Sequence, residues 1–394
     1  MNRTSVAPAP LIGLYAQPDL VLARGEGCWV WDEEGTRYLD FTAGIAVNAL
    51  GHGSPVVVRA IEGALSAGLI HSSNLFATRP VMELAQLLVE LSFPGKVFFC
   101  NSGAEANEAA LKFARRWAGS TGADAKRDFI SFRGAFHGRL FGTLAATDRE
   151  AYQAPFRPLM PGVHFFEVGD DAGVEALLSS GTVAAVFIEP VQGEGGVRPV
   201  PARFLRVLRE LCARHGALLV FDEIQCGLGR TGKVFAHQHA GVIPDIMTLA
   251  KPLAGGLPMG AVIASDAVAD AMHPGDHGTT FGGGPLVASV ATAVVRALSE
   301  PSLLEGVRAR AAHLVRGLER LRSKIPGIQE VRGMGLMQGL VLDGQAAPVV
   351  GKAREKGLLV LSAGPDVVRL LPPLVVSEDE LDQGLEILGE AFHA

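Results

Sequence analysis

The spacing of apolar and polar positions changes along the chain and predicts alternating strands and helices through its middle. Short apolar runs typical of buried strands occupy 96–100, 183–188, 218–222 and 245–250, and another begins at 129. Between two of these runs, 202–216 has helical spacing with one apolar face and Gly216 as a C-terminal stop. The alternation from about 96 to 265 predicts an α/β fold with a large, mostly parallel sheet.

The two ends of the chain follow other patterns. A β-hairpin is predicted around Glu34-Gly35, and apolar spacing predicts helical structure over about 55–92. After Pro285, two helices at 285–299 and 302–324 lead to mixed strands and helices, with a last helix from Ser377. These patterns predict a large α/β domain over 56–284 and a smaller α+β domain formed by 1–55 and 285–394.

Composition and charge exclude several classes of protein. Of the 394 residues, 48% are hydrophobic, which suits a chain with a large buried core. The net charge of −6 provides no basic surface for nucleic acid. No apolar run is long enough to cross a membrane and the N-terminus lacks a signal-peptide pattern, so we expect a cytoplasmic protein that binds neither membrane nor nucleic acid. The four cysteines, Cys28, Cys100, Cys212 and Cys226, lack metal-ligand spacing and are predicted to be free and buried, and no metal site is predicted.

Two charged residues stand where predicted strands end. Asp222 closes the run 218–222, and Lys251 follows the next run among apolar neighbours. A buried carboxylate needs donors or a cation, and a buried lysine tends to be neutral, paired or bonded as an imine. Either residue alone is more often an ordinary strand-end residue. Together they suit pyridoxal phosphate, whose ring nitrogen pairs with an acid and whose aldehyde bonds to an amine.

A phosphate site is predicted after the strand at 96–100. Asn101-Ser102-Gly103 reads as a turn, and a helix begins near Ala104. The free backbone amides at the start of a helix that follows a strand form an anion site. The alternative is that Ser102 only caps the helix.

A second glycine-rich loop matches a different cofactor pattern. Gly227-Leu228-Gly229-Arg230-Thr231-Gly232 fits GxGxxG and follows a strand, which would suit an NAD-binding oxidoreductase. No helical run follows it, and no acid stands at the expected distance in a second strand. We therefore interpret it as a glycine-rich loop and keep the oxidoreductase as the alternative from another class.

Six ordered motifs carry a resemblance over nearly the whole chain. They are NSGAEANEAALK, AFHGR, EPVQGEGGV, FDEIQCGLGRTG, TLAKPLAGGLPMGA and HGTTFGGGPL. In this order the chain resembles the class III, fold type I pyridoxal-phosphate aminotransferases. The usual GGNP is Gly282-Gly283-Gly284-Pro285 here, and GHxHP is 51–55, GHGSP; both departures lie in loops.

The resemblance implies a complete cofactor site. Lys251 would bond to the cofactor's aldehyde and later carry the proton, and Asp222 would pair with the ring nitrogen. Gln225 would bond the phenolic oxygen, between Ile224 and Phe136 on the two ring faces. The phosphate would be held by Ser102, Gly103 and Ala104, and by Thr280 reaching in from a neighbouring subunit of a homodimer.

The resemblance also implies a substrate site that accepts two substrates. Arg139, with Thr279 nearby and Tyr15 closing the pocket, would bind the carboxylate of an ornithine-like substrate. Arg369 would be covered by Glu194 for that substrate and uncovered to bind the α-carboxylate of glutamate. The alternative is a permanent salt bridge between these two residues.

The implied reaction is transamination between N2-acetyl-L-ornithine and 2-oxoglutarate, giving N-acetyl-L-glutamate 5-semialdehyde and L-glutamate, as in arginine biosynthesis. Ile45 stands where relatives that use free ornithine have an aromatic residue, which favours an acylated substrate. The alternatives within the family are succinylornithine, 4-aminobutyrate, carrier-bound lysine and ornithine.

Overall fold

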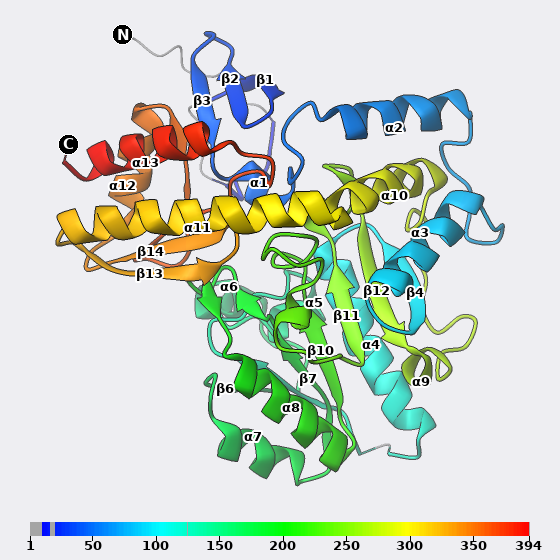
Figure 1. Cartoon of the computed structure of the whole chain (residues 1–394). Coiled ribbons are helices and arrows are strands. Elements are labelled where there is room, and N and C mark those ends of the chain that lie inside the picture. The colour runs from blue at the N-terminus through cyan, green and yellow to red at the C-terminus, as the bar shows by residue number, and fades with distance from the viewer. Residues whose placement is uncertain (1–9, 16–19, 124, 394) are drawn as a thin grey trace.

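The computed structural model describes residues 10–15, 20–123 and 125–393 and is built around a seven-stranded sheet (Figure 1). The strand order is β4 (Gly95–Cys100), β12 (Gly260–Ser265), β11 (Ile246–Leu249), β10 (Leu218–Asp222), β7 (Val183–Ile188), β5 (Asp128–Phe132) and β6 (Val163–Phe166). Only β12 is antiparallel to its neighbours. The predicted mostly parallel α/β sheet is therefore confirmed.

Helices cover both faces of this sheet, which explains why its central strands are mostly apolar. Helix α4 (Gly103–Ser120) packs on one face, where it meets Val220 of β10. Helices α7 (Asp171–Leu178) and α8 (Ala202–His215) pack on the other, against Leu219 and Phe221. Because successive residues of a strand point to opposite faces, both faces need apolar side chains. Helix α8 ends at Gly216 with φ 61°, as predicted.

Two smaller sheets are built from the ends of the chain. The first has the order β1 (Leu22–Glu26), β2 (Trp29–Asp32), β3 (Arg37–Asp40) and β15 (Leu358–Leu359), so the predicted hairpin gains a strand on each side. The second has the order β13 (Ile328–Met334), β14 (Met337–Leu342), β17 (Val367–Leu370) and β16 (Leu361–Ser362). Helices α11 (Pro301–Lys324), α12 (Ala346–Glu355) and α13 (Glu378–His393) lie beside these sheets (Figure 1). Helix α10 (Pro285–Ser299) instead packs against α2 (Pro55–Ser66) and α3 (Arg79–Leu91).

The prediction of helical structure over 55–92 was only partly right. Helix α2 (Pro55–Ser66) and helix α3 (Arg79–Leu91) are separated by a non-helical stretch. Gly68, with φ 75°, lies just after α2, and Pro80 stands in the first turn of α3. A glycine after a helix and a proline in its first turn both mark helix ends, and the spacing of apolar residues alone does not reveal them.

The remaining elements are short and lie mainly in the loops between these. They are α1 (Ala43–Ala46), α5 (Phe141–Ala145), α6 (Glu150–Gln153), η1 (Ala154–Phe156), β8 (Val191–Gln192), β9 (Arg198–Pro199), η2 (Ala236–His239), η3 (Lys251–Ala254) and α9 (Asp266–Ala269).

One apolar cluster joins all three parts of the chain. It contains Leu39 from the N-terminal part, Met247 from the large sheet and Leu340 from the C-terminal part. The division at 55 and 284 therefore stays a prediction. The four cysteines are free and buried, as expected. No single helix of the described ranges has the length and apolarity to cross a membrane, although the bent pair α10 and α11 passes on these two counts together.

Candidate functional site

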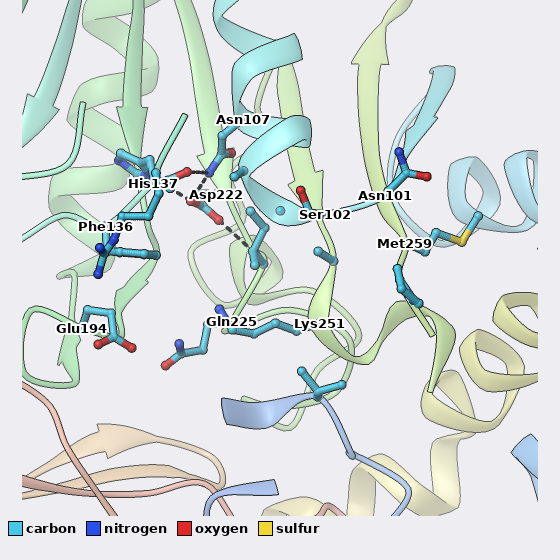
Figure 2. Close-up of a pocket in the computed structure, with 18 of the residues that line it drawn as sticks. Asn101, Ser102, Asn107, Phe136, His137, Glu194, Asp222, Gln225, Lys251 and Met259 are labelled. Atoms are coloured by element: carbon cyan, nitrogen blue, oxygen red, sulfur yellow. Dashed lines mark hydrogen bonds and ion pairs between the residues drawn. The ribbon is translucent and has the colours of Figure 1, made fainter. Parts of the chain in front are cut away.

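A cavity of about 400 Å³ opens at the C-terminal edge of the large sheet. Its walls come from the ends of several strands and from the start of α4 (Figure 2). This is the edge at which open α/β sheets bind ligands. The predicted site residues that line it are Ser102, Gly103, Ala104, Phe136, Arg139, Glu194, Asp222, Ile224, Gln225 and Lys251.

Asp222, the last residue of β10, is buried and receives three hydrogen bonds. The backbone N–H of Ile224 donates to Oδ1 at 3.0 Å. Asn107 Nδ2 and His137 Nδ1 lie 2.7 and 2.8 Å from Oδ2 (Figure 2). These contacts fix the orientation of the carboxylate and leave Oδ1 with a single backbone donor.

Two of these partners were not assigned to the site by the sequence. Asn107 lies on the buried face of α4 among alanines, and its Oδ1 accepts from Thr248 at 2.7 Å. A polar side chain on an apolar helix face was the available signal. His137 lies in the loop after β5, and its side chain is buried. Burial alone would lower the pKa of His137, but the hydrogen bond and charge of Asp222 outweigh it and the pKa is raised.

Lys251 enters the cavity directly after β11, in a strained backbone conformation. Its φ of 40° lies in the left-handed region, which costs energy for a residue other than glycine. Burial lowers the pKa of its ammonium group, and the charge of Asp222 only partly offsets this. Within 10–15, 20–123 and 125–393, no hydrogen bond or ion pair engages Lys251 Nζ. The amine is therefore available to a ligand.

The start of α4 forms the wall predicted to bind phosphate. Ser102 caps the helix, because its Oγ accepts from the N–H of Glu105 at 3.2 Å. The amides of Gly103 and Ala104 have no partner in the part of the chain that the structure describes, as expected in the first turn of a helix. A Cβ on Gly103 would lie only 2.8 Å from Ile224 Cδ1. The glycine therefore allows Ile224 to pack against the helix start.

A buried glutamate joins two loops of the site, and the sequence did not single it out as functional. Glu189 follows β7, and its Oε2 accepts from the N–H of Phe136 at 3.1 Å. Its Oε1 accepts from the N–H of Gly193 at 3.2 Å. Burial raises the pKa of the Glu189 carboxyl to about 7.

Glu194 lines the cavity and contacts Arg369, as expected, although Arg369 itself is not one of the lining residues. Arg369 lies on β17 with an exposed fraction of 2%, and its Nη1 is 2.5 Å from Glu194 Oε1. The same nitrogen is 3.2 Å from Gln225 Oε1. The side chain of Glu194 is 30% exposed, so the two partners differ strongly in their freedom to move.

Arg139 lies at the rim of the cavity. It is exposed, and its guanidinium stands 3.5 Å from the centre of the Tyr152 ring. Thr279 lies further out, where its Oγ1 accepts from Asn101 Nδ2 at 3.2 Å.

Three other residues do not line the cavity of a single chain. Thr280 is exposed, and so is Tyr15, with an exposed fraction of 88%. Ile45 is 43% exposed in a turn with positive φ angles, whereas Val47, two residues later, does line the cavity.

The second glycine-rich loop lies outside this cavity and is buried. The amides of Gly227 and Gly229 donate to Glu223 O at 2.9 Å and to Val234 O at 3.0 Å. Arg230, within the loop, is buried, and its Nη1 donates to Leu336 O at 3.0 Å. Only the short 3₁₀ helix η2 follows. The loop therefore offers no room for a dinucleotide, which argues against the oxidoreductase alternative.

Comparison with known proteins finds relatives that match nearly the whole chain. Residues 14–392 match the family Aminotransferase class-III. A mitochondrial acetylornithine aminotransferase of Alnus glutinosa is 50% identical over 98% of this chain and 86% of that protein. A succinylornithine transaminase of Yersinia pseudotuberculosis serotype I is 46% identical over 96% of this chain and 94% of that protein. The crystal structure of N-acetylornithine aminotransferase from Stenotrophomonas maltophilia K279a is 42% identical, with a TM-score of 0.84 over 95% of both chains.

Proposed function

The chain belongs to the class III aminotransferases, and from that premise we propose that it exchanges an amino group between N2-acetyl-L-ornithine and 2-oxoglutarate. Its fold is the fold type I of pyridoxal-phosphate enzymes, and pyridoxal phosphate is its cofactor. One observation carries the substrate proposal. Arg369 is wholly buried, yet the charge that neutralises it sits on Glu194, a side chain with access to the cavity.

The residues of the cavity fit this cofactor. The free amides of Gly103 and Ala104 suit its phosphate, and Phe136 and Ile224 suit the two faces of its ring. Asp222 suits the ring nitrogen, and Gln225 the phenolic oxygen. Bound at Lys251, pyridoxal phosphate supplies an electron sink for the bonds of the substrate's amine-bearing carbon.

The side chains around the cofactor have separate tasks. The lowered pKa of Lys251 favours its neutral amine, the form that can bond to an aldehyde and that can accept a proton at Nζ. Asn107 and His137 hold the Asp222 carboxylate in one orientation. Lys251 therefore moves protons, and Asp222 supplies a fixed negative charge.

Two arginines serve two kinds of substrate. Arg139 at the rim binds the carboxylate of the acylated ornithine, whose reacting amine is at the far end of the molecule. Meanwhile Glu194 keeps Arg369 neutralised. When glutamate enters, Glu194 swings away and Arg369 binds the α-carboxylate. A buried arginine left without either partner would be strongly unfavourable, so one anion replaces the other.

Succinylornithine is the second candidate substrate. A relative of that name is nearly as similar to this chain as the acetylornithine enzyme. An aliphatic residue at position 45 does not favour one acyl group over the other. Steady-state rates with N-acetylornithine, N-succinylornithine, ornithine and 4-aminobutyrate would separate them. We expect the highest kcat/KM for N-acetylornithine, and comparable turnover of free ornithine would contradict the proposal.

We further infer a homodimer in which Thr280 completes the phosphate site of the partner. Exposed apolar side chains surround Thr280, and two contacts hold their segments together: Asn74 Nδ2 to Thr279 O at 2.8 Å, and His71 to the ring of Phe281. The exposed apolar residues are Leu69, Ile70, Leu75, Phe76 and Phe281. A patch of this kind marks an interface. A monomer at micromolar concentration by light scattering would contradict this inference. The cytoplasmic location stays a prediction.

A further inference from the structure

Two loops form one side of the cavity, and each carries a residue proposed to contact substrate or cofactor. The platform loop, 133–139, follows β5 and carries Phe136 and Arg139. The switch loop, 189–197, follows β7 and carries Glu194. Strands β5 and β7 are neighbours in the sheet, so the two loops leave the same edge side by side.

The carboxylate of Glu189 ties the two loops together. One oxygen accepts from the amide of Phe136 and the other from the amide of Gly193, which immediately precedes Glu194. Glu189 is 6% exposed, so water cannot readily replace either hydrogen bond. The side chain therefore connects the residue that faces the cofactor ring with the base of the switch.

A second set of contacts joins the same loops. Gln192 Nε2 donates to the backbone oxygen of Arg133 at 2.9 Å. A Cβ on Gly195 would lie 2.5 Å from the backbone oxygen of Gly134, so the two backbones are packed without space for a side chain. The backbone oxygen of Glu194 itself accepts from Arg149 Nη2. The backbone of the switch loop is therefore fixed on both sides of Glu194.

We propose that Glu189 is a positioning residue that holds the platform loop and the switch loop as one rigid unit, so that Glu194 covers and uncovers Arg369 by side-chain rotation over a fixed backbone. This inference rests on the proposed two-substrate function. In this proposal Glu189 has a task distinct from that of Asp222, because Glu189 sets the position of Glu194 relative to Arg139. That distance decides how long a substrate can be while Glu194 still covers Arg369.

Glu189→Gln tests the proposal, because an amide oxygen can satisfy only one of the two backbone N–H groups and its NH₂ opposes the other. We expect the KM for N-acetylornithine to rise about tenfold, in line with the loss of one hydrogen bond to a charged group, while kcat changes less. The half-reaction with glutamate needs Glu194 displaced, so its KM should change less than about threefold. Single-turnover kinetics of each half-reaction measure these values in the holoenzyme.

Glu223→Gln is the matched control. Glu223 is also buried and also accepts two backbone N–H groups, from Ala236 and His237, but it does not line the cavity. We expect the two variants to lose similar thermal stability, and only Glu189→Gln to change the ratio of the two KM values. An unchanged ratio in both variants, or the same change in both, would overturn the proposal.

Gln192→Leu provides a second test if Glu189→Gln does not fold. It removes the bond to Arg133 and leaves Glu189 in place. The ratio of KM values should shift in the same direction by a smaller factor, and an unchanged ratio would overturn the proposal. If the wild type does not use N-acetylornithine, the proposed function fails, whereas the ratio measured with whichever ω-amine it does use still tests the rigid unit.

Discussion

Two glycine-containing loops leave the large sheet, and their backbone amides are engaged in opposite ways. After β4, the amides of Gly103 and Ala104 have no partner among the described residues and face a cavity. After β10, the amides of Gly227 and Gly229 are bonded within the protein, and the loop is covered. The second loop has the more familiar cofactor pattern, yet the first has the properties of an anion site. What makes such a site is unpartnered N–H groups beside open space, and a glycine pattern alone does not provide them.

The largest expected effect compares the lysines associated with the two loops. Lys251 faces the cavity at the first loop, and Lys233 directly follows the second, where its Nζ donates to Gln238 O at 2.9 Å. Lys251→Ala should lower kcat by roughly 10²–10⁴-fold, since a positioned proton carrier contributes about that much. Lys233→Ala should leave kcat within about twofold. Undiminished amino transfer in Lys251→Ala would refute the site assignment.

Two glycine substitutions, one in each loop, test the comparison further. Gly103→Ala places a Cβ against Ile224 and pushes that side chain into the cavity, so we expect about tenfold weaker cofactor binding. Gly229→Ala is strained by its φ of 91° and by Leu374 at 3.0 Å, so we expect a loss of about 1–3 kcal/mol in unfolding free energy with unchanged cofactor affinity. Cofactor titration and denaturant unfolding of the apoprotein measure the two effects. The comparison fails if both variants lose cofactor affinity equally.

The third comparison concerns pH and the burial of the second loop. Burial raises the pKa of Glu223, beneath that loop, from 4.5 to about 8. Between these values the folded chain holds a proton that the unfolded chain has released, so this contribution to stability is lost as the pH rises through about 8. The wild type should therefore lose stability relative to Glu223→Gln by up to roughly 1.4 kcal/mol per pH unit. Chemical unfolding at pH 5, 6.5 and 8 tests this, and a constant difference would contradict it.

The site residues that could be predicted from sequence pattern stand at the end of a strand or at the start of a helix. Asp222 ends an apolar run and Gly103 opens a helix, so local pattern was enough for both. Asn107 and Glu189 depend on contacts between segments far apart in sequence, which no local pattern reveals. The partnership of Glu194 with Arg369 was expected only through the family resemblance.

The same limit applies to the fold. Periodicity predicted β4, β5, β7, β10 and β11 of the large sheet, because they are apolar runs long enough to show a pattern, but it did not single out β6 or β12. It missed β13, whose side chains are mostly half-buried or exposed, and it missed the break between α2 and α3. The position of His137 was not predicted either, since a loop that follows a strand can turn back onto the sheet as well as outward.

The backbone of Lys251 has a consequence for anyone who evolves this enzyme for heat resistance. Glycine would adopt φ 40° at that position with less strain, so we expect the cofactor-free chain to be more stable with glycine there than with lysine. Selection on melting temperature alone would therefore favour loss of the catalyst. A directed-evolution campaign has to demand turnover in every round.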